Sequence, residues 1–111
     1  MAFLGIVATF KEERNFRIQL LIGSIVILFM MVLSLNYIEK SILLLTILMV
    51  LSLELINSQI EKFLDIIQSD HHPMVKRIKD FSAGAVLLSV LGSIVIGILI
   101  FLPYIISLIK R

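Results

Sequence analysis

Four polar side chains share one narrow face of the helix that is predicted at the end of the second apolar run. At 3.6 residues per turn, Glu54, Asn57, Glu61 and Asp65 lie at relative angles of roughly 0°, −60°, −20° and +20°. A charged group in membrane hydrocarbon costs about 3 kcal/mol or more, and those that persist usually face a bundle interior or a polar site. These three carboxylates and one amide are therefore the residues that most need a function.

More charged residues are predicted on the same side of the membrane, next to this face. Closely spaced carboxylates suit a hard divalent cation, and lysines beside them suit phosphate. A carboxylate deeper in the membrane could take a proton from a lipid hydroxyl. Together these groups would serve phosphoryl transfer from a nucleotide–metal complex to a lipid alcohol, although the sequence has neither a P-loop nor the protein-kinase motifs. The additional residues are Glu12, Glu13, Asp70, His71, His72, Lys79 and Asp80.

The composition is that of a membrane protein. The 111 residues are 59% hydrophobic, with a mean hydropathy of +1.10, so we predict a single domain over 1–111 whose helices pack in lipid. There is no cysteine, which excludes disulfides, zinc–thiolate sites and thiol nucleophiles. The net charge is +2, but the basic residues flank apolar runs, which indicates membrane topology and not nucleic-acid binding.

The apolar runs predict an all-α fold with three transmembrane helices, over residues 18–35, 41–60 and 81–105. Residues 1–10 are apolar but too short to span, so we predict a short interfacial helix there. Pro73 is expected to open the third helix and Pro103 to mark its outer end. Small residues every four positions in the third helix predict a face for close helix packing; these are Ala85, Ser89, Ser93 and Gly97.

The basic residues predict the orientation in the membrane. Cytoplasmic segments carry an excess of Lys and Arg. Most of the ten basic residues precede the first span or lie in the second connection, so the N-terminus and the charged site are predicted in the cytoplasm and the C-terminus outside. The expected location is a cell membrane, with the charged site on its cytoplasmic face. The predicted cytoplasmic residues are Lys11, Arg14, Arg17, Lys62, Lys76, Arg77 and Lys79.

Other interpretations of these residues stay open at this point. The two histidines fit an ordinary loop, Asn57 could bond a neighbouring helix, and Lys79 with Asp80 could be an anchor and a helix cap. A proton- or cation-coupled transport subunit would use Glu54 and Glu61, but has no need for the clustered polar loop. A non-catalytic scaffold would leave the Glu54–Asp65 face unexplained.

Three segments resemble the small prokaryotic diacylglycerol kinase family. The run from Glu54 to Asp65 is similar to its E-x-x-N-[ST]-x-x-E-x-x-x-D signature, and the run from Glu13 to Arg17 to its E-x-x-F-R segment. His71-His72-Pro73 and the stretch from Lys79 to Leu87 resemble its loop and its K-D-x-x-A-x-A-V-L start of the third span. The similarity covers nearly the whole chain, and the Glu-Arg-Asn-Phe and His-His-Pro variants look most like the undecaprenol kinase branch of Gram-positive bacteria.

The resemblance implies an enzyme that uses ATP and Mg²⁺ to phosphorylate a lipid alcohol. Undecaprenol is the expected acceptor and diacylglycerol the alternative, and the expected assembly is a homotrimer with sites shared between subunits. Glu54 would be the general base, Glu13 and Glu61 would hold Mg²⁺ on the nucleotide, and Asn57 would order the site. The nucleotide would contact Asp70, His71, His72, Lys79 and Asp80, while Asn15, Phe16, Arg17 and Gln19, with Glu54 and Asn57, would border the lipid.

Two features depart from the family pattern. The N-terminal segment is shorter than usual and lacks the basic residue that typically precedes the glycine matched by Gly5. Gln59 stands where a small residue is usual, which could alter packing around the lipid.

Overall fold

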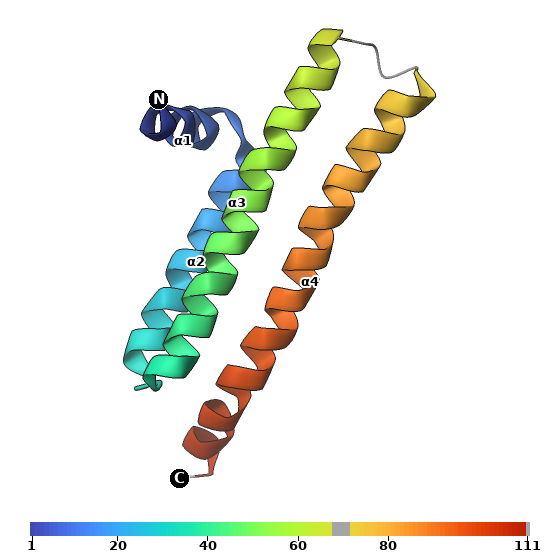
Figure 1. Ribbon diagram of the computed structural model, residues 1–111. Helices are drawn as coiled ribbons and strands as arrows, with labels where there is room; N and C mark the ends of the chain where they lie inside the picture. Colours follow the sequence, from blue (N-terminus) through green and yellow to red (C-terminus); the bar gives the residue numbers. More distant parts are fainter. Residues whose placement is uncertain (68–71, 111) are drawn as a thin grey trace.

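The fold is entirely helical in the part of the chain that the computed structural model describes, residues 1–67 and 72–110. Helices α2, α3 and α4 run alongside one another, and α1 lies across one end of them (Figure 1). Three of these helices are long and apolar enough to cross a membrane, which confirms the predicted class. The bounds are α1 Ala2–Glu12, α2 Arg14–Val32, α3 Tyr37–Ile67 and α4 Pro73–Ile109.

A single extended residue separates α1 from α2. Glu13 has φ −108° and ψ 111°, so the helix breaks there and α1 turns away from the axis of α2. The break is stabilised on its α1 side, where Arg17 Nη1 donates to the carbonyl oxygens of Phe10 and Lys11, at 2.9 Å each. A cation that binds the last carbonyls of a helix satisfies acceptors that have no partner within it. The predicted short helix thus exists, and it ends at a corner that carries Glu13.

The α2–α3 connection is a tight turn followed by a reciprocal helix cap. Ser34 has a positive φ of 56°, which ends the first spanning helix earlier than predicted. Asn36 Oδ1 accepts from the amide of Glu39 at 2.8 Å, and Glu39 Oε1 accepts from the amide of Asn36 at 3.2 Å. This exchange is a capping box, which satisfies two free donors at the start of α3. Helix α3 then runs for 31 residues, about 46 Å, well beyond the 41–60 prediction.

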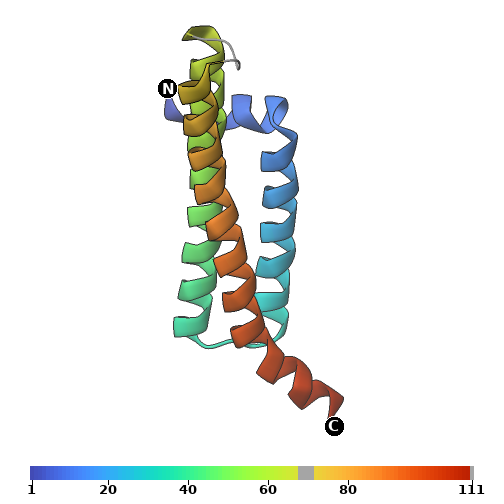
Figure 2. The same cartoon turned by 90° about the vertical axis from the view of Figure 1, so that its right-hand side faces the viewer.

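Helix α4 begins where the sequence predicts and ends later. Pro73 occupies its first turn, as expected, because a proline there has no missing hydrogen bond to lose. The prediction that Pro103 marks the outer end is wrong, since the helix continues to Ile109. Figure 2 shows this end of α4 turning away from its main axis, the usual effect of an internal proline. Next to the proline, the Tyr104 hydroxyl donates to Glu39 Oε1 and links α4 to the start of α3.

Helices α2 and α3 pack tightly at Gly23. A Cβ atom added to Gly23 would lie 2.9 Å from Cγ2 of Ile47, so only glycine fits there without a shift. On α4, by contrast, an added Cβ at Gly92 or Gly97 would meet nothing within 4 Å. None of the most apolar 18-residue window of α4 is buried within the chain. On the small-residue face predicted on α4, Ser93 and Gly97 instead line a space between the helices, and Gly97 has no close neighbour there.

Gly23→Ala should destabilise the protein by about 1–3 kcal/mol, because Ile47 is β-branched and cannot easily move aside in a helix. The measurement is reversible unfolding in detergent micelles. Gly92→Ala is the matched control, and its stability should equal or exceed that of the wild type, because alanine favours helix and its methyl group meets open space. Equal stability of Gly23→Ala and Gly92→Ala would contradict the close α2–α3 contact.

Candidate active site

A carboxylate is buried in the membrane-spanning part of the bundle. Glu54 lies on α3 with only 4% of its surface exposed, although its helix is apolar on most faces. The negative charges of Glu61, about two turns further along the same face, and of Glu13, at the α1–α2 corner, both act on it. Segments that are far apart in the sequence thus bring three carboxylates into one electrostatic cluster. The predicted general base and the two predicted metal ligands are the members of that cluster.

The polar face of α3 has a buried part and an exposed part. Asn57 is buried, and its Nδ2 donates to Glu61 Oε1 over a long 3.5 Å contact. Its Oδ1 is also buried and has no hydrogen-bond partner in the part of the chain described. Asp65, at the far end of the face, is exposed and pairs with Lys79 of α4. Glu54, Asn57 and Glu61 therefore form the inner site, and Asp65 joins two helices at its rim.

Glu13 has an ion-pair partner, Lys62, that was not predicted from the sequence. Lys62 Nζ lies 3.6 Å from Glu13 Oε1 and 3.3 Å from Glu12 Oε1, so one lysine of α3 contacts both acidic residues of the corner. The contact to Glu12 joins residues 50 positions apart, which no local pattern reveals. The only signal in the sequence was a lysine directly after Glu61.

The predicted nucleotide residues on α4 occupy the end of the bundle nearest this corner (Figure 1). His72 is the N-cap of α4, and its Nδ1 accepts from the amide of Met74 at 3.1 Å, so its ring has a structural role. Lys79 is paired with Asp65, while Asp80 is exposed within the helix and does not cap it. Asp70 and His71 lie outside the described residues.

The predicted lipid residues at the start of α2 have different environments. Phe16 is buried, with 3% of its surface exposed, whereas Asn15 and Arg17 are exposed. Arg17 bonds to the end of α1, so in this chain its guanidinium shapes the corner. Gln19 is half-buried, and its Oε1 is a buried acceptor with no partner among the residues described. Of these residues, Gln19 is the one that reaches a cavity.

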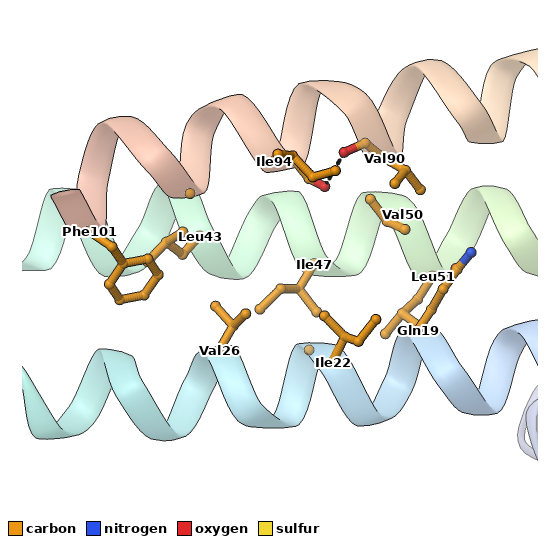
Figure 3. Close-up of a pocket in the computed structure, with 13 residues that line it drawn as sticks. Gln19, Ile22, Val26, Leu43, Ile47, Val50, Leu51, Val90, Ile94 and Phe101 are labelled. Carbon is orange, nitrogen blue, oxygen red and sulfur yellow. Dashed lines mark hydrogen bonds between the residues drawn. The ribbon is translucent and has the colours of Figure 1, made fainter.

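An apolar cavity of about 310 Å³ lies between α2, α3 and α4. Figure 3 shows Gln19 and Leu51 at one end of it and Phe101 at the other, with aliphatic side chains between. Val50 and Leu51 line the wall of α3, and Glu54 follows them by one turn, about 5 Å along the helix. The cavity thus extends through the apolar region, and the buried carboxylate, which does not line it, lies about one helical turn beyond it on α3.

A second hollow, of about 750 Å³, lies between α1 and α3. Thr9, Glu12, Gln59 and Lys62 contribute to its lining. Gln59 is exposed and faces α1, and it does not line the apolar cavity. The expectation that this residue alters packing around the lipid is therefore not supported by its position within one chain.

The donor set suits magnesium carried by a nucleotide and does not form a complete metal cage. Within residues 1–67 and 72–110, no group of three or more His, Cys, Asp or Glu side chains is arranged to hold a metal ion. Mg²⁺ usually keeps several waters and binds through one or two carboxylates plus substrate phosphates. Glu13 and Glu61 would supply two such carboxylates.

The sequence is similar to a protein-family profile and to several known proteins. A family profile described as prokaryotic diacylglycerol kinase matches residues 1–101. The chain is 41% identical over 99 residues to an undecaprenol kinase of Bacillus subtilis, covering 89% of this chain and 80% of that protein. It is 36% identical over 108 residues to a diacylglycerol kinase of Synechocystis, covering 96% of this chain and 62% of that longer protein. A diacylglycerol kinase of Haemophilus influenzae is 31% identical over 99 residues, which cover 87% of this chain and 84% of that protein.

Arg17→Met should loosen the end of α1 while leaving the three long helices intact. The substitution keeps an unbranched side chain but removes both hydrogen bonds to the carbonyls of Phe10 and Lys11. Hydrogen–deuterium exchange should be faster for amides of α1 near the corner and unchanged in the centre of α3. Unchanged exchange in α1 would show that the guanidinium does not hold this helix end.

Proposed function

The chain belongs to the prokaryotic diacylglycerol kinase family and is therefore a lipid kinase, and on that premise we propose that it transfers the γ-phosphate of ATP to undecaprenol. The acceptor is proposed from the likeness to the Bacillus subtilis undecaprenol kinase, the relative at 41% identity. The alternative acceptor is diacylglycerol, because other relatives are named as kinases of that lipid. The cavity walls are aliphatic and suit the apolar chain of either lipid.

The observation that carries this proposal is the position of the buried Glu54 about one helical turn beyond Val50 and Leu51, which line the apolar cavity. A lipid chain in the cavity would place its hydroxyl within about one helical turn of this carboxylate. Glu54 would accept the hydroxyl proton as the oxygen attacks phosphorus, which is general-base catalysis. Its burial restricts water at this point, so the alcohol is favoured as the acceptor. Gln19, with a buried amide oxygen that lacks a partner among the described residues, is available to the polar end of the lipid.

Glu13 and Glu61 are proposed to hold the magnesium ion that ATP brings, and that ion would offset the negative charge of the phosphates. Asn57 donates to Glu61 and would keep that carboxylate turned toward the metal. Lys79 lies at the rim on α4, where its ammonium could also reach the nucleotide. Asp70, His71, His72 and Asp80 stay in the proposed nucleotide site from the family resemblance. Because Glu13 and Glu61 are assigned to the metal, Glu54 is the carboxylate that would accept the proton of the lipid hydroxyl.

The proposed assembly is a homotrimer with sites formed between subunits. Helix α4 is at least partly exposed along its most apolar 18 residues, since none of these residues is buried within one chain. Its many exposed apolar side chains, such as Leu88, Ile98 and Leu99, would be covered by another copy. The buried Oδ1 of Asn57 lacks a partner in the described part of one chain and would find one on a neighbour or a substrate. The proposed orientation puts α1, the corner and the nucleotide on the cytoplasmic side.

Glu54→Gln should abolish phosphoryl transfer while nucleotide binding persists. The substitution keeps the size and burial of the side chain but removes the proton acceptor, and a general base typically contributes about 10²- to 10⁴-fold in rate. Turnover is measured with labelled ATP and lipid in mixed micelles, and binding with a non-hydrolysable ATP analogue. Asp65→Asn is the control on the same helical face, and it should keep most of the activity. Near-normal turnover by Glu54→Gln would refute its role as the base.

Mixed subunits test whether sites are shared. Asp80→Ala and Glu54→Ala subunits are each expected to lose activity alone. Glu13, Glu54 and Glu61 of one chain act together, so a shared site would combine that cluster with Asp80 of a neighbouring chain. When the two variants are mixed and reassembled, some sites will contain a native Glu54 from one chain and a native Asp80 from another, so activity should partly return. The measurement is transfer activity across a range of mixing ratios, with each variant mixed with itself as the control. No recovery at any ratio would place both residues of a site in one chain.

A further inference from the structure

The corner that carries Glu13 is fixed to the rest of the chain by two cations. Arg17 binds the end of α1 from the α2 side, and Lys62 reaches the corner from α3. Lys62 thus links the corner to α3, the helix that carries Glu54 and Glu61.

We propose that Lys62 is a positioning residue that holds the Glu13 carboxylate beside Glu61, so that both can bind the metal of the nucleotide. The inference rests on the proposed function, because it assumes that Glu13 is a metal ligand. Lys62 does not touch the reacting atoms in this account. Lys62 would hold the α1–α2 corner in place through its hydrogen bond to Glu12.

The distances favour a role in which Lys62 positions Glu13 over one in which Lys62 competes with the metal ion for Glu13. Lys62 Nζ donates a hydrogen bond to Glu12 Oε1 at 3.3 Å, whereas Glu13 Oε1 lies farther away, at 3.6 Å. Glu13 can therefore bind a metal ion through its oxygens while Lys62 keeps its bond to Glu12. The Glu12 side chain is 59% exposed and the Glu13 side chain 27% exposed, so the anchor is at the surface and the ligand is turned inward.

The expected effect of removing Lys62 is small but measurable. Ion pairs that are partly exposed contribute little, because water and salt screen them and the side chains lose conformational freedom. Lys62→Met keeps the length of the side chain and removes its charge. It should raise the Mg²⁺ concentration needed for half-maximal binding of a non-hydrolysable ATP analogue by about two- to fivefold. Binding of the same analogue in EDTA should not change, because no step of the proposal involves contact between Lys62 and the phosphates.

Two variants control this experiment. Lys62→Arg keeps a cation that can reach both carboxylates and should restore the wild-type Mg²⁺ requirement. Lys76→Met removes the same charge from an exposed position on α4 and should leave the Mg²⁺ requirement unchanged. A lower or unchanged Mg²⁺ requirement in Lys62→Met, or an equal rise in Lys76→Met, would overturn the proposal. A lower requirement would mean that the lysine competes with the metal.

A double-variant comparison separates this inference from the proposed function. Glu13→Gln should itself raise the Mg²⁺ requirement, and adding Lys62→Met to it should cause no further rise, since there is then no ligand left to position. If Glu13→Gln leaves the requirement unchanged, Glu13 is not a metal ligand and the proposed site is wrong. If Glu13→Gln raises the requirement and Lys62→Met does not, only the role of Lys62 fails.

Discussion

The arrangement of this protein depends on one constraint, which is that a carboxylate within an apolar helix must be shielded from lipid. Glu54 meets this constraint by facing the interior between helices, where 4% of its surface is exposed. A charge that is costly in hydrocarbon becomes useful where a proton must be accepted from a lipid hydroxyl. The neighbouring elements are arranged around it: α2 and α4 enclose an apolar cavity below it, and the α1–α2 corner brings a further acidic residue above it.

The apolar and the charged residues of the candidate site lie at different positions along the helices. Apolar side chains of α2, α3 and α4 line the cavity, which suits the chain of a lipid. The charged residues of the candidate site lie on the segments near the end of the bundle where α1 crosses, α3 ends and α4 begins, an arrangement of helices that Figure 1 shows. In the proposed reaction, a water-soluble nucleotide and a membrane-bound alcohol would approach the same carboxylate from opposite directions. Phosphoryl transfer requires little covalent chemistry from the protein, so this positioning would supply much of the catalysis.

Periodicity and hydropathy predicted much of this arrangement from the sequence. The spacing of Glu54, Asn57 and Glu61 placed them on one face of a helix, and the structure buries two of them and half-buries the third. The three apolar runs predicted three spans, and Pro73 marked a helix start. Residue patterns suffice here because each feature depends on neighbours within one or two turns. The resemblance to the kinase family added the roles of Glu13 and the loop, and the family itself is confirmed.

Contacts between distant segments could not be predicted in the same way. Lys62 meets Glu12 and Glu13 only because α1 folds back across α3, and that depends on the extended conformation of Glu13. Arg17 was expected beside the lipid, but the end of α1 provides carbonyl oxygens within its reach. Pro103 does not end α4, because a long membrane helix can tolerate one lost hydrogen bond where neighbouring groups stabilise it. Asp65 belongs to the polar face by periodicity, but pairs with Lys79 of another helix.

The most direct test of this account is transfer of label from [γ-³²P]ATP to lipid by the purified protein in mixed micelles. Undecaprenol and diacylglycerol are offered separately, each with and without Mg²⁺. The account predicts Mg²⁺-dependent formation of labelled lipid phosphate, with undecaprenol the better acceptor. Faster labelling of diacylglycerol would change the acceptor and leave the site intact. The absence of labelled lipid from both alcohols, in protein that remains helical and binds nucleotide, would contradict the central claim.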